Sequence, residues 1–260
     1  MGLFRALTIG LFILAIPVAL ITTNIRVAVS EQRVYDYSVQ TYDASAASGI
    51  PEDELLRANG EIKHYLTSED PGPLSINVRN NRGVNGALFT AKETAHMADV
   101  RGLVQAFFLT QIISVAAVLS LAVVMLVMWP PRALAMAALC GALLTSGILG
   151  GAALVAASGF DSAWTQFHQL AFTNDFWALD PDTDHLIQMF PEAFWQKITT
   201  LIVTATLLEV VLTLGASGGY LLVSRPRASE RIALAAPSVA GPAGHSRPKL
   251  APPNPRHYFR

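Results

Sequence analysis

The sequence predicts an all-α membrane bundle of four transmembrane helices, with a small α+β extracytoplasmic cap and a short helical second outer segment. The chain has 260 residues, of which 52% are hydrophobic and only 14% are charged, and its mean hydropathy is +0.40. A soluble domain carries about 25% charged residues. The charges are also unevenly distributed: they are missing from four long stretches and concentrated in the segments between them.

Each of these stretches is long enough to cross a bilayer, whose hydrocarbon core of about 30 Å needs about 20 helical residues. The first is longer than the apolar part of a signal peptide and no A-x-A site follows it, so we expect a retained helix despite Pro17. The predicted organisation is transmembrane helix 1 at residues 1–26, the cap at 27–90, an interfacial helix continuing into transmembrane helix 2 at 91–129, helix 3 at 133–158, the second extracytoplasmic segment at 159–192, helix 4 at 193–223 and a disordered cytoplasmic tail at 224–260.

The distribution of charge predicts the orientation in the membrane. The short linker between the second and third stretches contains Arg132 and no acid, and the tail begins with Arg225 and Arg227. All but two of the 19 acidic residues lie at 26–101 or 161–197. Because positively charged loops stay in the cytoplasm, we expect both termini there and the two acidic segments outside.

The tail and the one cysteine carry no expected chemistry. The tail is rich in Pro, Ala and Arg, so we expect it to be disordered near anionic lipid heads, with His245 and His257 solvated. Cys140 is the only cysteine, which excludes an internal disulfide. It lies in the third stretch, where a small hydrophobic role fits, and Leu139 before it departs from a lipidation motif.

The first outer segment should have structure of its own. Pro51 and the three acids after it suit the first turn of a helix and its dipole. Alternation over residues 74–78 predicts a strand, and the Asn/Gly-rich stretch 80–86 predicts its turn. Apolar residues with helical spacing predict the buried face of the helix: Leu55, Leu56, Ile62, Tyr65 and Leu66.

A second helix of this segment should run directly into the second span. Thr90 and Glu93 have the spacing of a capping box. On the helix that they start, Glu93, His96 and Asp99 project to one side. At ~1.5 Å rise per residue, His96 lies roughly 9 Å from Gly102, where the charge-free run begins. That depth corresponds to lipid headgroups and ester bonds.

The second outer segment is rich in aromatic residues. His168 shares an apolar helical face with Trp164 and Phe172, and Asp180-Pro181 ends that region before a short helix at 186–190. An aromatic belt at the membrane interface explains the Trp and Phe residues. It does not explain a histidine with several acids beside it.

His96 and His168 therefore stand as candidates for general acid–base chemistry on an acyl group, because imidazole titrates near neutral pH. The chain has no HExxH motif, no Cys/His cluster and no G-x-S-x-G motif, so we expect no metal and no serine hydrolase. A structural or pH-sensing role for the histidines in a non-catalytic membrane protein stays open at this point.

Two features of the spans are left without a function. Glu209 lies inside the fourth span, where it could be neutral and hydrogen-bonded to a nearby threonine or to another helix. The pairs Gly147/Gly151 and Gly215/Gly219 have small-xxx-small spacing, which predicts close helix packing.

Three motifs together resemble the bacterial lipoprotein intramolecular transacylase family (Lit), as do the four spans with a large first outer segment and a short second one. The motifs are Thr90-x-x-Glu93-x-x-His96-Met97-x-Asp99-Val100, Phe167-His168-x-x-x-Phe172-x-Asn174-Asp175-x-Trp177-x-Leu179-Asp180-Pro181 and Leu186-Ile187-x-x-Phe190-Pro191.

The resemblance implies a reaction in the bacterial cytoplasmic membrane: the sn-2 acyl chain of a diacylglyceryl-cysteine moves to the α-amino group of that cysteine. It implies diacylated lipoproteins and membrane phospholipid as partners, no nucleic acid and no cofactor. His96 and His168 match the family's two catalytic histidines. Residues that would orient these rings or line the site are Glu93, Asp99, Asn174, Asp175 and Asp180.

Two other readings fit the same residues. One is a non-catalytic membrane protein whose outer segments bind a lipid or a partner. The other is a lipid acyltransferase or deacylase with a different acceptor.

Overall fold

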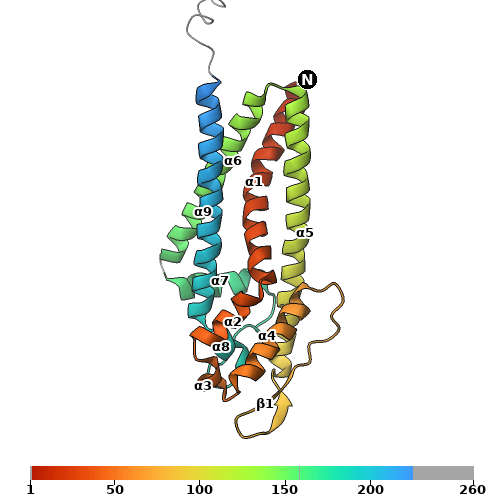
Figure 1. Ribbon diagram of the computed structural model, residues 1–260, viewed down its shortest axis with the longest axis vertical. Helices are drawn as coiled ribbons and strands as arrows, with labels where there is room; N and C mark the ends of the chain where they lie inside the picture. Colours follow the sequence, from red (N-terminus) through yellow and green to blue (C-terminus); the bar gives the residue numbers. More distant parts are fainter. Residues whose placement is uncertain (1, 158, 225–260) are drawn as a thin grey trace, which may run out of the picture. The chain divides into compact units, whose positions relative to one another are not determined.

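A computed structural model describes residues 2–157 and 159–224, so the predictions for the rest of the tail, including His245 and His257, lie outside the described residues. The elements, shown in Figure 1, are α1 (Gly2–Ser30), α2 (Gln32–Thr41), α3 (Ala44–Ser48), α4 (Glu52–Thr67), β1 (Asn77–Arg79), β2 (Asn85–Ala87), α5 (Ala91–Met128), α6 (Pro131–Ala157), α7 (Phe160–Ala171), α8 (His185–Met189) and α9 (Glu192–Val223).

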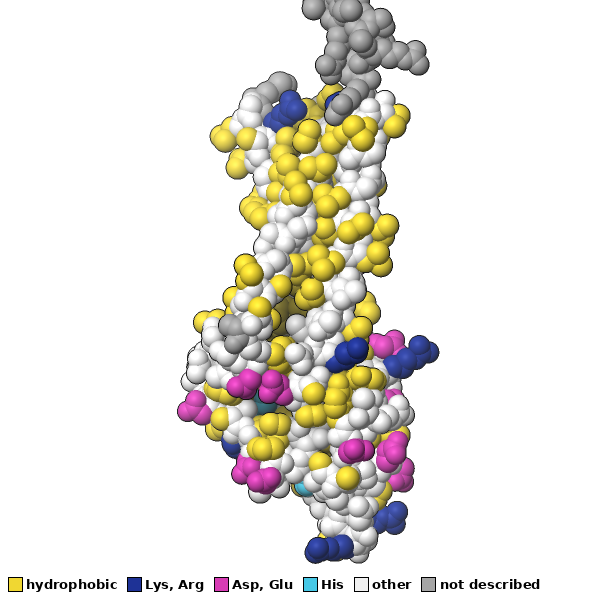
Figure 2. Space-filling view, turned by 90° about the vertical axis from the view of Figure 1, so that its left-hand side faces the viewer, with side chains coloured by type: hydrophobic (Ala, Val, Ile, Leu, Met, Phe, Trp, Pro, Cys, Tyr) yellow, Lys and Arg dark blue, Asp and Glu magenta, His cyan; other side chains and the backbone are white. Residues whose placement is uncertain are grey.

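The predicted fold class is confirmed. Among the described residues, α1, α5, α6 and α9 are the four helices long and apolar enough to cross a membrane. They lie side by side as a bundle, with α1 between α5 and α9 (Figure 1). Figure 2 shows hydrophobic side chains along the bundle and acidic side chains gathered at the opposite end from the chain's N-terminus.

A cap formed by residues 31–90 covers one end of the bundle. Its core is the buried face of α4, where Leu55 and Ile62 are at most 1% exposed, packed against α2, the hairpin and α8. The hairpin pairs Asn77 with Ala87 and Val78 with Gly86. The strand thus begins three residues later than the alternation predicts.

The helices α2 and α3 are not predicted by the sequence. In α2, Tyr35 is buried although most residues of the helix are polar; its ring packs edge-on against Phe190, with centroids 6.3 Å apart. Its hydroxyl donates to the carbonyl oxygen of Val29 (2.7 Å), and its own carbonyl accepts from Asn59 Nδ2 (2.8 Å). Distant contacts, rather than local periodicity, therefore fix α2.

The prediction for the glycine pairs is wrong. A Cβ built at Gly147, Gly151, Gly215 or Gly219 would meet no atom within 4 Å. The close approach is instead at Gly141 of α6, where a Cβ would lie 2.5 Å from Cδ1 of Ile16 on α1. Spacing alone does not say which helix face meets a neighbour.

Glu209 has a partner on another helix. Its Oε2 accepts a hydrogen bond from Nδ2 of Asn24 on α1 (2.9 Å), and the same amide nitrogen lies 3.1 Å from Oγ1 of Thr206, which is fully buried. Since water is excluded from the bundle interior, these contacts fix α1 against α9 by satisfying polar groups that would otherwise be desolvated.

Replacing Asn24 by Leu should lower the free energy of unfolding by about 1 kcal/mol, because polar contacts between transmembrane helices contribute about that much. Unfolding in mixed micelles with increasing denaturing detergent measures the change.

Ser120→Ala is the matched control, since this exposed hydroxyl donates only to Ala116 of its own helix. An Asn24→Leu protein as stable as the Ser120→Ala protein would contradict the assigned role of this contact.

Candidate active site

The first turn of α5 is built around a buried carboxylate. Oγ1 of Thr90 accepts from the N–H of Glu93 (3.2 Å), and Oε2 of Glu93 accepts from the N–H of Thr90 (2.7 Å), which completes the predicted capping box. Oε1 of Glu93 accepts from the N–H of Leu186 in α8 (2.7 Å). Glu93 is 0% exposed. It therefore ties the start of α5 to the segment from α7 to α8.

Two histidines from separate segments lie close together near these hydrogen bonds of Glu93. His96 lies one turn after Glu93, in the part of α5 that precedes the charge-free run from Gly102, and His168 lies on α7. Their ring centroids are 6.0 Å apart and their planes are inclined by 38°. Both side chains are buried. The structure thus brings the two candidate histidines together from separate parts of the chain.

The hydrogen bonds of the two rings differ. Nδ1 of His168 lies 2.8 Å from the carbonyl oxygen of Trp164. A carbonyl oxygen can only accept, so Nδ1 carries the proton and Nε2 of the neutral ring keeps a free lone pair. Nδ1 of His96 is buried and has no hydrogen-bond partner in the described part of the chain. One imidazole is oriented by the backbone, and the other keeps a ring nitrogen for a ligand.

Aromatic side chains enclose both imidazoles. The Phe172 ring lies edge-on to His96 at 5.2 Å and tilted to His168 at 5.6 Å, measured between centroids. The Trp177 ring lies 5.2 Å from that of His168. The helical spacing that predicts a shared face for His168 and Phe172 agrees with this contact. No contact of Trp177 with His168 is predicted by the sequence, which assigns Trp177 only to an interfacial belt.

Two contacts hold the loop between α7 and α8 against α5. Nδ2 of Asn174 donates to Oδ2 of Asp99 (2.9 Å), and Oδ1 of Asn174 accepts from the N–H of Phe176 (3.0 Å). Nζ of Lys92 donates to the carbonyl oxygen of Ala178. Asp99 is one turn from His96 on α5, so its charge faces the site.

The other predicted supporting residues have different contacts. Oδ1 of Asp180 accepts from the N–H of Asp182 (2.9 Å), which closes a turn, and the Asp175 side chain is exposed. Among the described residues, no hydrogen bond joins Glu93, Asp175 or Asp180 to either imidazole. In the same ranges, no three His, Cys, Asp or Glu side chains gather as metal ligands.

The model of one protein family, described as lipoprotein intramolecular transacylase Lit, matches residues 10–195. The chain belongs to the Lit family. The match spans the two histidines, the cap and the first three spans, together with the start of α9. A comparison with curated proteins gives no match.

Solved structures agree with Lit membership at the level of the fold. The membrane integral lipoprotein intramolecular transacylase Lit from Bacillus cereus superposes with a TM-score of 0.73 at 19% sequence identity, over 89% of this chain and 100% of that one. Two variants of the same protein, with one histidine replaced by arginine or by alanine, superpose with TM-scores of 0.69 at 18% identity. These two matches cover 96% and 97% of the variant chains, respectively, and 89% of this chain.

In this Lit-family chain burial favours the neutral form of both imidazoles. Burial lowers the pKa of His96 to about 4; the neighbouring His168 acts in the same direction, and the charge of Asp99 partly opposes both. Burial also lowers the pKa of His168, which the hydrogen bond to Trp164 partly offsets. Neutral rings are the form that can accept a proton from a substrate.

These pKa shifts predict that the protein loses stability in acid. The unfolded chain binds a proton at His96 near pH 6.5, whereas the folded chain does so only near pH 4, so unfolding becomes more favourable as the pH falls between these values. Thermal unfolding midpoints between pH 4 and 7.5 measure the slope.

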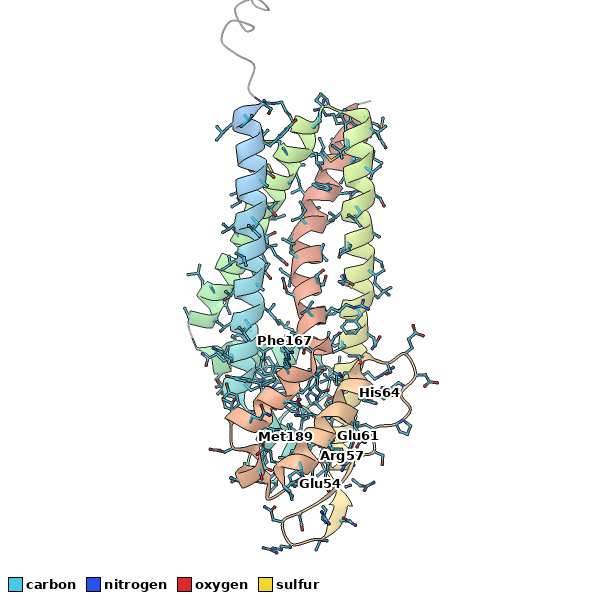
Figure 3. All side chains as sticks on the ribbon, in the orientation of Figure 1. Glu54, Arg57, Glu61, His64, Phe167 and Met189 are labelled. Atoms are coloured by element: carbon cyan, nitrogen blue, oxygen red, sulfur yellow. The ribbon has the colours of Figure 1, made fainter. Side chains whose placement is uncertain are left out.

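His96→Leu should flatten this acid dependence, because the titrating group is gone. His64→Leu, which removes an exposed histidine of α4 (Figure 3), is the matched control and should keep the slope of the parent. Equal slopes for the two variants would contradict the burial argument.

Proposed function

We propose that this chain is a lipoprotein intramolecular transacylase that moves the sn-2 acyl chain of a diacylglyceryl-cysteine to the α-amino group of the same cysteine. The observation that carries the proposal is the pair of buried, neutral imidazoles 6.0 Å apart, at the end of the apolar helices of a Lit-family chain. The product is a lipoprotein with one glyceryl ester and an N-acylated cysteine.

The site is proposed to lie on the outer face of the bacterial cytoplasmic membrane, with both termini in the cytoplasm. The distribution of Lys and Arg supports this orientation. In the proposed orientation the histidines lie beyond the hydrocarbon of the outer leaflet, at the depth of the glycerol esters of a lipoprotein and of neighbouring phospholipids. A substrate anchored in the bilayer then reaches the rings without leaving the membrane.

In the proposed mechanism one proton is transferred from nitrogen to oxygen. The free amine attacks the sn-2 carbonyl carbon, and Nε2 of His168 takes the proton that the nitrogen loses as the N–C bond forms. The resulting imidazolium returns this proton to the glycerol oxygen as the C–O bond breaks. His168 suits this role because its Nδ1–H is already held by Trp164.

The proposed role of His96 is to stabilise the oxyanion that forms when the amine attacks. Its neutral ring carries one N–H, which can donate to the carbonyl oxygen as negative charge develops there. The aromatic enclosure keeps water from competing for the acyl group. Because the ester and the amine belong to one molecule, their proximity lowers the barrier and no external acyl donor is required.

Replacing His96 or His168 by Ala should lower acyl transfer by about 100-fold or more, since general acid–base groups contribute about 10²–10⁴. Mass spectrometry of lipoprotein N-termini, from cells carrying each variant as their one copy of the gene, measures the N-acylated lyso-form. His64→Ala is the control and should retain activity. Full activity in either site variant, with normal membrane insertion, would contradict the mechanism. If the parent protein yields no lyso-form lipoprotein, the proposed function itself is wrong.

The Asp99–Asn174 contact should position the loop that carries Phe172 and Trp177. Asn174→Ala and Asp99→Ala should each lower the rate about 10-fold, because a hydrogen bond to a charged group contributes about 1.5–3 kcal/mol. Asp99→Asn keeps an acceptor oxygen and should retain most of the rate.

The double variant Asp99→Ala/Asn174→Ala should be no slower than either single variant, since both remove the same contact. A multiplicative loss would show that the two residues act independently and would contradict the assigned contact.

A further inference from the structure

The helix α7 has one broad apolar side, whose two edges differ in packing. At one edge, Trp164 stacks on Trp195 of α9 with centroids 5.1 Å apart, and His168 is buried. At the other edge, Leu170 is 89% exposed, and Phe167, which stacks on Trp164, is 38% exposed. Residues three and four apart share a helix face, so Ala163, Phe167 and Leu170 form one strip, which we call the α7 edge.

The remainder of α7 is polar. Its exposed side chains away from the α7 edge are Asp161, Ser162 and Gln169, while Gln166, one turn before Leu170, borders the edge. A short helix with a strongly polar side and an exposed apolar edge is typical of helices that lie in the plane of a membrane interface. The length of α7, twelve residues, is too short to span a bilayer.

The surface around the α7 edge is continuous with lipid-facing surface. The last turns of α6, a span that ends at Ala157, expose Leu154 by 77%, and α7 begins at Phe160. Figure 3 shows Phe167 at the level where the bundle gives way to the cap, and Figure 1 shows α7 at that same level. An α6 that spans the membrane has its exposed apolar surface against acyl chains, so the same occupant fits the adjoining edge.

We propose that the α7 edge inserts among the acyl chains of the lipid leaflet, and that α7 is an interfacial helix docked on lipid. Its polar side then faces the headgroups. Because His168 lies on the same helix, this docking sets the depth of the ring in the membrane. This last step rests on the proposed function, in which the ring must meet an ester at that depth.

Site-directed spin labelling of the full chain tests the docking without using activity. In a Cys140→Ala background, Leu170→Cys and Gln169→Cys each carry one nitroxide, in nanodiscs of phosphatidylethanolamine and phosphatidylglycerol. The label at 170 should collide more often with oxygen, which partitions into lipid, than with a water-soluble nickel chelate. The label at 169, on the polar side of the same helix, should show the reverse order.

Equal access of the nickel chelate to both labels would overturn the proposal. So would spin–spin broadening at position 170, which would show a second copy of the chain there instead of lipid. Position 170 is almost fully exposed, so the label should not disturb packing, and gel filtration of both labelled proteins checks this.

A second comparison tests the consequence for the site. Leu170→Glu should reduce formation of the lyso-form lipoprotein, because a charge on the edge lifts α7 out of the leaflet, whereas Gln169→Glu, on the polar side, should not. If both variants are as active as the parent, the lipid contact does not set the depth of His168. If the parent forms no lyso-form lipoprotein, the proposed function fails while the spin-label result still decides the docking.

Discussion

The buried carboxylate of Glu93 is the constraint on which the site depends. Its two oxygens accept hydrogen bonds from the backbone N–H groups of Thr90 and Leu186, so one side chain caps α5 and also fixes the segment that carries α7 and α8. His96 follows Glu93 by one helical turn. His168 lies on α7, in the segment that Glu93 holds against α5, and this brings the two imidazoles together. The family resemblance implies that Glu93 orients an imidazole or lines the site, whereas the hydrogen bonds of its carboxylate join two chain segments.

Much of the fold follows from local signals in the sequence. The four spans are visible because the absence of charge over about 20 residues is a property of each stretch by itself. The capping box is equally local, and it fixes where α5 begins and hence which side of that helix His96 and Asp99 share. The pair His96 and His168 could be singled out because each stands beside acids at the predicted membrane boundary, and family resemblance then supplied their roles.

The remaining features depend on contacts between distant parts of the chain. The second partner of Glu93 is a backbone N–H, which no side-chain pattern reveals. The helix α2 forms around Tyr35, whose burial depends on Phe190. Glu209 could be suspected of a polar partner, yet only the packing of α1 against α9 shows that this is Asn24. For the same reason the spacing of glycines failed to identify Gly141 as the close contact.

The central claim is that ester and amine react within one lipoprotein molecule between two neutral imidazoles. A crossover measurement with the purified protein tests it most directly. Two diacylglyceryl lipopeptides, one with a heavy peptide and a heavy sn-2 acyl chain and one with both light, are mixed in the same vesicles and the products are weighed by mass spectrometry. The account predicts only heavy–heavy and light–light N-acylated products. Mixed products, or acyl chains released as free fatty acid in place of N-acylated peptide, would contradict it.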